Sequence, residues 1–391
     1  MDRIDQDIVE DMQRWRRDIH ANPEIAFAEQ RTSALVAKEL AALGLQVDRG
    51  LAGTGVVATL SRGEGPRIGL RAEMDALPIE EAGRLPHRSL VSGVMHACGH
   101  DGHTAMLLGA AKQLSRHGDF SGIVRFIFQP AEENEGGAKR MLEEGLLQRF
   151  PCDAIYALHN WPSLPAGQFA INRGPMMAAF DIFEIVVCGS GTHAAMPEMG
   201  CDPFVPVAQI LLALQTIASR RLSPHDAAVI SVTQVHGGDT WNVIPAEATI
   251  RGTARCFSET VRDAIENNLR TIVEATAAAH GATTRIIYER RYPATVNGVR
   301  EADFAASVAA TMAAAIPVQI DGGPSMASED FGFLLQKIPG AFIWLGAGDE
   351  DHCVPLHNPR YDFNDDLLEI GARYWVRLIQ QALARDPTER V

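Results

Sequence analysis

The stretch Ile123-Val-Arg-Phe-Ile-Phe128 is followed at once by Gln129-Pro-Ala-Glu-Glu-Asn-Glu-Gly-Gly137. The first segment is typical of a buried β-strand, and the second places two adjacent carboxylates, Glu132 and Glu133, between that strand and a Gly-Gly turn. A Glu pair is most often two exposed loop acids, but this position favours a role in a site. Ligands of open α/β sheets bind beyond the carboxyl ends of the strands, so the stretch predicts a sheet with a site at its edge.

Short apolar runs alternate with helical patterns on both sides of this strand. Further strands are predicted at residues 56–60, 68–72, 154–158 and 341–345, and helices at about 5–20, 28–43, 104–114, 138–144, 302–315 and 365–383. This alternation predicts an α/β domain whose mixed, largely parallel sheet is covered by helices on both faces.

The pattern changes in the middle of the chain. Strands are predicted at residues 181–187, 228–235, 248–255 and 284–288, with helices at 203–220 and 258–279. This β-α-β-β-α-β order is that of the ferredoxin-like unit, a four-stranded antiparallel sheet with two helices on one face. We therefore expect residues 178–292 to form a domain inserted into a discontinuous one made of residues 1–177 and 293–391.

Composition narrows the function classes. The chain has 391 residues, of which 46% are hydrophobic, and a net charge of −14, which disfavours binding to nucleic acid or to an anionic membrane. No apolar run approaches the length of a membrane span, and the N-terminus lacks the apolar core of a signal peptide, so cytoplasmic residence is the expectation. The six cysteines show no paired spacing and are expected to be reduced.

A dense group of ligand-type side chains lies in His96-Ala-Cys-Gly-His-Asp-Gly-His103. Thiolate, imidazole and carboxylate together suit zinc or another transition-metal ion. Cys98 and His100 would point in nearly opposite directions on a helix, so they can share an ion only on an extended or loop backbone. The alternative is a polar helix start with Asp101 as the N-cap, but the number of ligand types favours metal.

Other polar residues follow predicted strands at the same edge of the sheet. Glu73 and Asp75 follow the strand at 68–72, His159 ends the strand at 154–158, and His357 lies in the loop after the strand at 341–345. Asp75 could instead cap the turn before Pro78, and each histidine could be a satisfied core residue. Their convergence at one edge favours a site.

Five motifs, taken together and in order, resemble the aminoacylase/carboxypeptidase family of two-metal peptidases. They are His96-Ala-Cys-Gly-His-Asp-Gly-His103, Pro130-Ala-Glu-Glu133, Leu158-His-Asn160, Gly191-Thr-His-Ala-Ala-Met-Pro197 and Met326-Ala-Ser-Glu-Asp-Phe331. The most similar branch contains hippurate hydrolases, N-acyl-amino-acid amidohydrolases and plant auxin-conjugate hydrolases. The resemblance implies a metallopeptidase domain interrupted by a lid domain that often mediates dimerisation. Glu73 and Ala327 stand where that branch more often has Asp and Gly.

The resemblance also implies a role for each matching residue. Cys98, His100, Glu133, His159 and His357 would be the metal ligands, with Cys98 bridging two ions. Glu132 would be the general base, and Asp75 would orient a ligand. His193 would donate a hydrogen bond to the developing oxyanion, in cis or from a partner subunit. Asn242 and Arg255 would hold the carboxylate or carbonyl of the substrate; alternatively, His193 is a mobile surface residue and Arg255 a solvated strand end.

The resulting expectation is a metal-dependent amidohydrolase that cleaves N-acyl amino acids with a metal-activated water. Hippurate-like, N-acetyl and indole-acetyl conjugates are candidate substrates, and two ions of zinc, manganese, nickel or cobalt are candidate cofactors. A homodimer or higher homo-oligomer is expected from the family. Two alternatives stay open: a hydrolase of carbamoyl or dipeptide bonds, and a non-catalytic metal-binding scaffold on the same fold.

Overall fold

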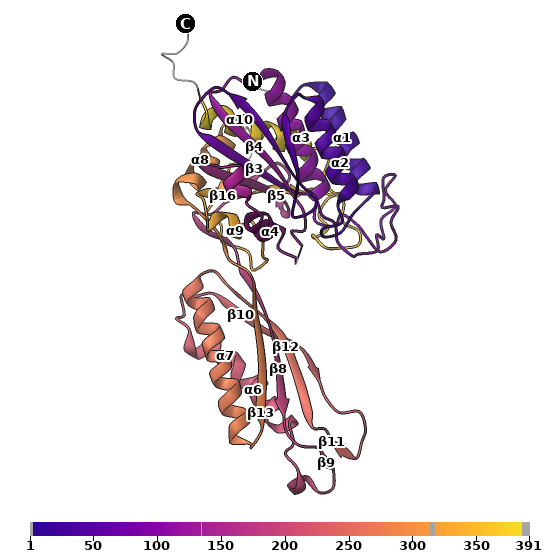
Figure 1. Ribbon diagram of the computed structural model, residues 1–391, viewed down its shortest axis with the longest axis vertical. Helices are drawn as coiled ribbons and strands as arrows, with labels where there is room; N and C mark the ends of the chain where they lie inside the picture. Colours follow the sequence, from indigo (N-terminus) through magenta and orange to yellow (C-terminus); the bar gives the residue numbers. More distant parts are fainter. Residues whose placement is uncertain (1–2, 134, 313–316, 385–391) are drawn as a thin grey trace. The chain divides into compact units, whose positions relative to one another are not determined.

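The computed structural model describes residues 3–133, 135–312 and 317–384. The chain forms two compact units, labelled by their elements in Figure 1. Unit 1 contains residues 1–176, 296–323 and 330–391, and unit 2 contains residues 177–295 and 324–329. No helix among the described residues combines the length and apolarity that crossing a membrane requires.

Unit 1 is built on an eight-stranded sheet with the order β1-β2-β4-β3-β5-β16-β6-β15. Its strands are β1 (Gln46–Leu51), β2 (Gly55–Arg62), β3 (Arg67–Glu73), β4 (Gly122–Gln129), β5 (Ala154–Pro165), β6 (Phe169–Ile171), β15 (Gln319–Ile320) and β16 (Gly340–Gly348). The four central strands, β4, β3, β5 and β16, run parallel, whereas β1 and β2 add an antiparallel edge. The prediction of a mixed, largely parallel sheet is confirmed, and the carboxyl ends of the central strands meet at one edge.

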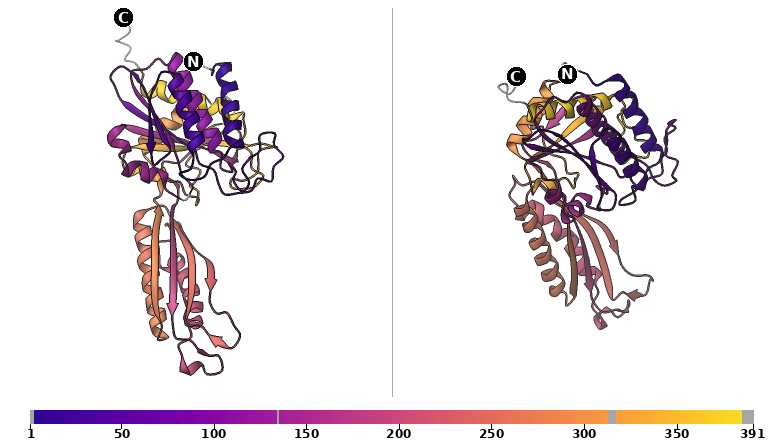
Figure 2. Two further views of the ribbon diagram at one scale, coloured as in Figure 1. Left: turned by 45° about the vertical axis from the view of Figure 1, so that its right-hand side comes forward. Right: turned by 45° about the horizontal axis from the view of Figure 1, so that its top comes forward.

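Helices cover both faces of this sheet (Figures 1 and 2). They are α1 (Gln6–Ala21), α2 (Gln30–Ala42), α3 (His100–His117), α4 (Gly137–Glu143), α5 (Leu146–Arg149), α8 (Val299–Ala310), α9 (Gly332–Leu335) and α10 (Leu367–Ala382). Leu158 and Ile343 point into the apolar core shared with α1, α3 and α10. Phe342, the neighbour of Ile343 in β16, instead contacts Phe331 beside α9. Strand residues of the central sheet are therefore buried in alternation against both helical layers.

Unit 2 contains a four-stranded antiparallel sheet with the order β10-β12-β8-β13. Its larger elements are β8 (Ala179–Cys188), α6 (Phe204–Thr216), β10 (Ala228–His236), β12 (Glu247–Cys256), α7 (Glu259–Ala279) and β13 (Thr283–Tyr292). Phe183, Ile185 and Val187 alternate along β8 and enter one core with α6 and α7, and Figure 2 shows both helices on the same face of the sheet. The Ser258 hydroxyl caps α7 by accepting the Val261 N–H.

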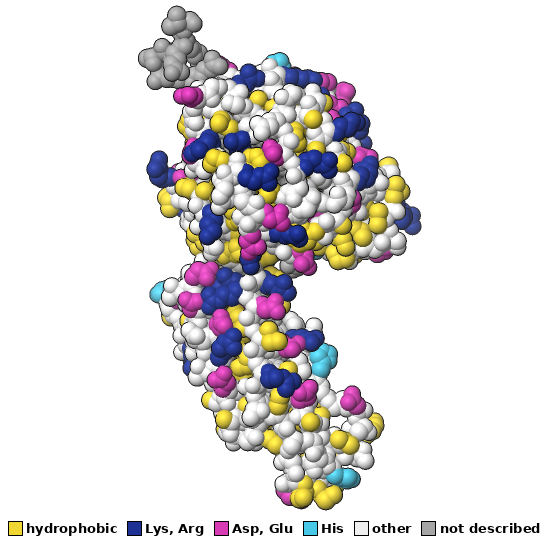
Figure 3. Space-filling model, viewed as in Figure 1, with side chains coloured by type: hydrophobic (Ala, Val, Ile, Leu, Met, Phe, Trp, Pro, Cys, Tyr) yellow, Lys and Arg dark blue, Asp and Glu magenta, His cyan; other side chains and the backbone are white. Residues whose placement is uncertain are grey.

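Smaller elements complete the described chain. They are β7 (Gly174–Met177), β9 (Thr192–His193), a 3₁₀ turn (Pro197–Met199), a π-helical turn (Ile217–Arg221), β11 (Val243–Ile244) and β14 (Thr295–Asn297). On the face drawn in Figure 3, basic and acidic side chains are interspersed on both units.

Several boundaries differ from the sequence prediction. The helix expected at 104–114 begins at His100 and ends at His117. Strand β5 does not end at His159 but continues to Pro165, because it keeps pairing with β16. It pairs with β3 only as far as Ala157, so His159 lies two residues beyond the last residue of β5 that pairs with β3. The helix expected at 302–315 begins earlier, at Val299, and residues 313–315 of that prediction lie outside the described part of the chain.

Candidate active site

One glycine brings Cys98 and His100 to the same place. Gly99 has φ 95°, a left-handed conformation, and α3 begins at the next residue, His100. Cys98 therefore lies on a loop while His100 lies on the first turn of a helix. The two residues are not on one continuous helix, on which their side chains would point in nearly opposite directions. They can therefore share a metal ion, as the sequence pattern predicts.

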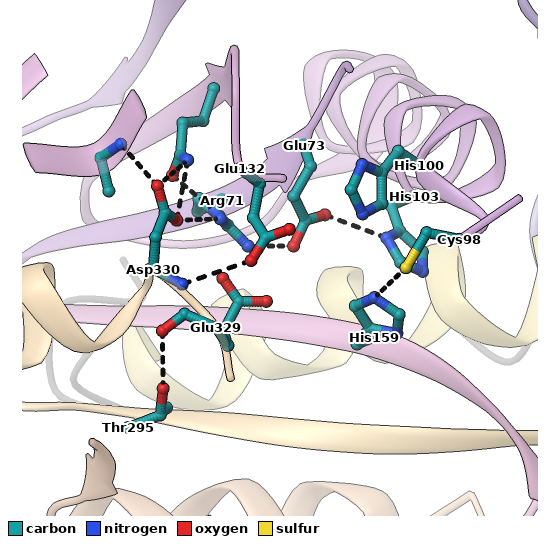
Figure 4. Close-up of polar contacts among 12 residues, drawn as sticks. Arg71, Glu73, Cys98, His100, His103, Glu132, His159, Thr295, Glu329 and Asp330 are labelled. Carbon is teal, nitrogen blue, oxygen red and sulfur yellow. Dashed lines mark hydrogen bonds and ion pairs between the residues drawn. The ribbon is translucent and has the colours of Figure 1, made fainter. Parts of the chain in front are cut away.

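The predicted ligands form overlapping clusters in unit 1. The ligand atoms of Cys98, His100 and His159 all lie within 4.8 Å of one another, and so do those of Cys98, Glu133 and His357. The Cys98 Sγ is 3.4 Å from the His159 Nε2, and Figure 4 shows the thiol directed at that ring. The His357 Nε2 lies 3.1 Å from the Glu133 Oε1. Cys98 is the member common to both groups, so its sulfur lies between two sets of donors.

Burial favours the uncharged forms of His159 and Cys98. The Nδ1 of His159 donates to its neighbour's carbonyl, the Asn160 O, at 2.7 Å, so its Nε2 keeps a lone pair for a metal. Burial and the nearby His103 lower the pKa of His159 well below its ordinary value. Burial, then Glu133 and Glu132, raise the pKa of Cys98 well above its ordinary value. A thiolate at Cys98 therefore requires a positive charge beside it.

His100 supplies a buried nitrogen without a protein partner. Its Nδ1 donates to the Asp75 O at 2.9 Å, whereas its Nε2 is buried and has no hydrogen-bond partner. An orphaned ring nitrogen in a cluster of sulfur, nitrogen and carboxylate donors is what a zinc-type ion satisfies. The residues present therefore fit the metal that the sequence pattern predicts.

Asp75 contacts the residues that hold two of the predicted ligands. Its Oδ1 lies 3.3 Å from the His100 Nδ1, and its Oδ2 accepts the backbone N–H of Glu133 at 2.9 Å. Burial alone would raise the pKa of Asp75, but His100 and the N–H donors lower it, so the group is held as a carboxylate. This geometry suits the orienting role predicted for Asp75.

Glu132 and Glu133 follow a strained turn after β4. Ala131 has φ 54°, which is uncommon for a residue with a side chain. The backbone N–H of Asp330 donates to the Glu132 Oε1 at 3.3 Å (Figure 4). The carboxylate of Asp330 is itself bound by Arg71, Gln129 and the Ala138 N–H. One oxygen of the Glu132 carboxylate is thus held by Asp330, a buried residue whose own side chain is bound by three groups.

His103 and Glu73 form, with the predicted ligand His100, a further buried group whose donor atoms lie within 4.8 Å of one another. The His103 Nε2 accepts the Asn160 N–H at 3.0 Å, so its Nδ1 donates to the Glu73 Oε2 at 2.9 Å. Burial would raise the pKa of Glu73, but Arg71 and His103 lower it well below its ordinary value.

Sequence reasoning gave no role to Asn160 or Asp330. The Asn160 Nδ2 donates to the Cys98 carbonyl at 3.3 Å and to the Tyr361 hydroxyl at 3.0 Å. Both residues lie within quoted motifs, Leu158-His-Asn160 and Met326-Ala-Ser-Glu-Asp-Phe331, which was the only signal available. Their function depends on contacts with distant segments.

His357 reaches the cluster from a long loop. It follows β16 by nine residues, has φ 62°, and its backbone N–H donates to the Ala97 O at 2.7 Å. Its side chain is 52% exposed, unlike the other predicted ligands. This backbone bond ties the loop to the segment that carries Cys98.

The remaining candidates lie in unit 2. His193 is exposed on β9, where it pairs with Val243 of β11, and the Ala194 N–H donates to the Asn242 carbonyl at 3.0 Å. Arg255 lies near the far end of β12, eight residues beyond Glu247, which corresponds to about 26 Å of strand. Its guanidinium contacts the Ser328 hydroxyl at 2.9 Å and the Phe180 ring at 4.0 Å. Within unit 2, His193 and Asn242 are neighbours, and Arg255 stands apart.

Comparisons with known proteins agree with this geometry. The profile of peptidase family M20/M25/M40 matches residues 69–381. The hippurate hydrolase of Campylobacter jejuni is 39% identical over 373 residues, covering 95% of this chain and 96% of that enzyme. The N-acetylcysteine deacetylase of Bacillus subtilis is 39% identical over 366 residues, covering 93% and 94%. The crystal structure of YXEP from Bacillus subtilis, a dinuclear metal-binding peptidase of the M20 family, is similar with a TM-score of 0.86 and 35% identity, covering 98% of this chain and all of the other.

Proposed function

The chain belongs to peptidase family M20/M25/M40, and from this membership and its donor cluster we propose that it hydrolyses the amide bond of N-acyl amino acids. Its similarity to hydrolases and a deacetylase makes it a hydrolytic enzyme, and the dinuclear relative supports two divalent metal ions. The acyl group, the amino acid, the metals and the residue roles below are parts of the proposal.

The observation that carries the proposal is Cys98 shared between two donor groups beside a supported carboxylate. His100 and His159 complete one group, and Glu133 and His357 the other. Two divalent ions held there would polarise the scissile carbonyl and lower the pKa of the attacking water. Cysteine with histidine accepts zinc, nickel, cobalt or manganese, so availability contributes to the choice.

Glu132 is the general base of the proposal. It neighbours Glu133 in sequence, and the Asp330 N–H fixes one of its oxygens. A carboxylate in this position takes the proton from the attacking water and passes it to the departing amine. The proposal divides the two roles between these neighbours: Glu132 moves a proton and Glu133 binds metal.

Residues of unit 2 are proposed to bind the substrate. His193 donates a hydrogen bond to the oxyanion, a contribution often worth a few kcal/mol. Asn242 and Arg255 hold the substrate carboxylate or carbonyl. The substrate panel follows from the names of the relatives, hippurate and N-acetylcysteine, with indole-acetyl conjugates added. A lid role and homodimerisation of the inserted domain, 178–292, remain parts of the same proposal.

Metal reconstitution tests the activity directly. Apo-protein is reloaded with zinc, manganese, nickel or cobalt and offered hippurate, N-acetyl amino acids, indole-acetyl conjugates, N-carbamoyl amino acids and dipeptides. We expect hydrolysis of N-acyl amino acids by at least one loaded form. Preference for carbamoyl or dipeptide bonds would redirect the proposal to those substrates, and no turnover in any combination would favour a metal-binding scaffold.

The variant Glu132→Gln tests the base. We expect kcat to fall by about 10²-fold or more, because the proton acceptor is lost while the hydrogen-bonding shape remains. The metal content, measured by elemental analysis, should not change. Glu135→Gln is the matched control, because Glu135 is an exposed carboxylate of the same loop. A Glu132→Gln enzyme with a near-normal rate would remove Glu132 from the mechanism.

A further inference from the structure

The side chain of Glu29 is buried at the N-terminus of α2, but it does not cap that helix. Glu29 immediately precedes α2 and is 0% exposed, yet its carboxylate makes no capping hydrogen bond to that helix. Glu24 caps α2 instead, accepting the Arg31 and Thr32 N–H groups at 2.9 and 2.8 Å. Because another carboxylate caps α2, the buried Glu29 needs a different explanation.

Three donors from three segments converge on the Glu29 carboxylate. Its Oε1 accepts the backbone N–H groups of Phe27, at 3.0 Å, and of Ala131, at 2.9 Å. Its Oε2 accepts the hydroxyl of the buried Thr54 at 2.6 Å. Phe27 and Ala131 have φ 60° and 54°. A single oxygen therefore holds two residues in a conformation that side chains disfavour.

Ala131 is the residue at which the chain turns towards Glu132. Its N–H is bound by Glu29, and its carbonyl accepts the Gly137 N–H at 2.9 Å. A Cβ at Gly137 would lie 1.7 Å from the Pro130 carbonyl oxygen, so the two ends of the loop are in direct contact. Both polar groups of the Ala131 backbone are thus fixed immediately before Glu132 and Glu133.

We propose that Glu29 is a positioning residue that holds the Ala131 turn and thereby aims the Glu132 carboxylate. The inference rests on the proposed function, since Glu132 is the base in that proposal. Glu29 touches neither substrate nor metal in this scheme and acts only through the backbone of Ala131. A displacement of about 1 Å at a reacting group can cost about 10²-fold in rate, which sets the size of the expected effect.

The chain offers a series of matched variants. Glu29→Leu removes all three acceptor contacts. Glu29→Gln keeps an oxygen for Phe27 and Ala131, and its amide can donate to the Thr54 oxygen. Burial raises the pKa of Glu29 to about 7, so a neutral side chain of the same shape is a fitting replacement. Glu24→Gln weakens the cap of α2 without touching the Ala131 turn.

Two readouts are measured on the full-length, metal-loaded protein. The first is kcat and KM for the best substrate of the panel. The second is hydrogen exchange of the amides of residues 131–133, compared with exchange in the core strand β4. A purely structural role would change stability and exchange throughout the unit and would leave kcat intact in the folded variants.

We expect Glu29→Leu to lower kcat about 10- to 100-fold with little change in KM, and to speed exchange at 131–133 selectively. Glu29→Gln should recover most of the loss, and Glu24→Gln should lower the melting temperature only. The proposal would be overturned if Glu29→Leu kept the wild-type kcat and the wild-type exchange rates at 131–133. It would also be overturned if Glu29→Gln lost as much kcat as Glu29→Leu.

Thr54→Val provides the test if Glu29→Leu does not fold. It removes only the hydroxyl that fixes Oε2, and it should give a smaller fall in kcat together with faster exchange at 131–133. Unchanged values for both would overturn the proposal. A wild-type protein inactive on every substrate would defeat the proposed function alone, because the exchange data would still decide whether Glu29 holds the turn.

Discussion

Gly99 shows how one residue can decide whether a metal site exists. An ideal Cβ at this position would lie 2.0 Å from the Asn160 Oδ1 and 2.7 Å from the Tyr361 hydroxyl oxygen. The glycine thus permits both the left-handed turn between Cys98 and His100 and the close approach of Asn160, which binds the Cys98 carbonyl. Both functions need a residue without a side chain.

We expect Gly99→Ala to destabilise the protein by about 2 kcal/mol or more and to reduce the metal content sharply. Gly93→Ala is the matched control, because Gly93 also has positive φ, 75°, but nothing lies within 4 Å of its Cβ position. Urea denaturation measures the stability of both variants, and elemental analysis measures their metal content. Equal losses in the two variants would mean that the contact with Asn160 is unimportant.

The sequence could predict the cluster but not its supports. Cys98, His100 and His159 are ligand types next to strand ends or turns, a pattern visible in one dimension. Glu29 and Asp330 are ordinary acids in sequence. The Glu29 carboxylate accepts a backbone N–H 102 residues away, and the Asp330 backbone N–H donates to a carboxylate 198 residues away. Such long-range pairing depends on tertiary packing, which local patterns do not encode.

At the scale of elements, α1 and α3 are joined by buried charge. The His20 Nδ1 of α1 donates to the Asp101 Oδ2 of α3 at 2.9 Å, and its Nε2 lies 3.5 Å from the Glu81 Oε2. Arg16 of α1 lies 3.8 Å from the same aspartate and 2.8 Å from Asp365. All of these side chains are mostly or fully buried, so their pairing fixes how the two helices pack.

This cluster makes the stability depend on pH. Burial lowers the pKa of His20, but Asp101 and Glu81 outweigh it and raise that pKa to about 9. The folded state thus holds a proton that the unfolded chain releases near pH 6.5. The stabilisation, at most about 3 kcal/mol, is fully present below pH 6.5 and is lost as the pH rises through about 9.

The variant His20→Gln should abolish most of this dependence. Urea denaturation between pH 6 and pH 9 measures this pH dependence. The free energy of unfolding of the wild type should fall across the range, and that of the variant should change less. His117→Gln is the control, since His117 contacts Asp5 at the exposed end of α3. A variant that keeps the wild-type slope would assign the effect to another group.

Element boundaries show where sequence patterns stop being informative. The helix over 258–279 and the strand at 123–128 were predictable because capping and apolar periodicity are local signals. The extra length of β5 depends on β16, which pairs with it through Gly346 and Gly348. The π-helical turn at Ile217–Arg221, where a regular helix was expected up to 220, has no local signature of this kind.

At the scale of the molecule, each unit has a core of its own. Apolar side chains of α1, α3, α10 and the large sheet form one cluster, and those of α6, α7 and the four-stranded sheet form another. All five proposed metal ligands, Cys98, His100, Glu133, His159 and His357, belong to unit 1. Metal binding should therefore stabilise one unit directly and not the other.

Calorimetry with and without a chelator tests this partition. An ion present at about 100 times its dissociation constant adds about 2.7 kcal/mol to the free energy of unfolding of the structure that binds it. We expect chelation to lower the transition temperature of unit 1, identified by hydrogen exchange in β5, and to leave exchange in α7 of unit 2 unchanged.

Magnesium, which prefers oxygen ligands, should not replace zinc, and Cys98→Ser should weaken the response to zinc. Equal shifts in both units would show that their unfolding is coupled, whereas no shift in either would contradict a metal site built from these residues.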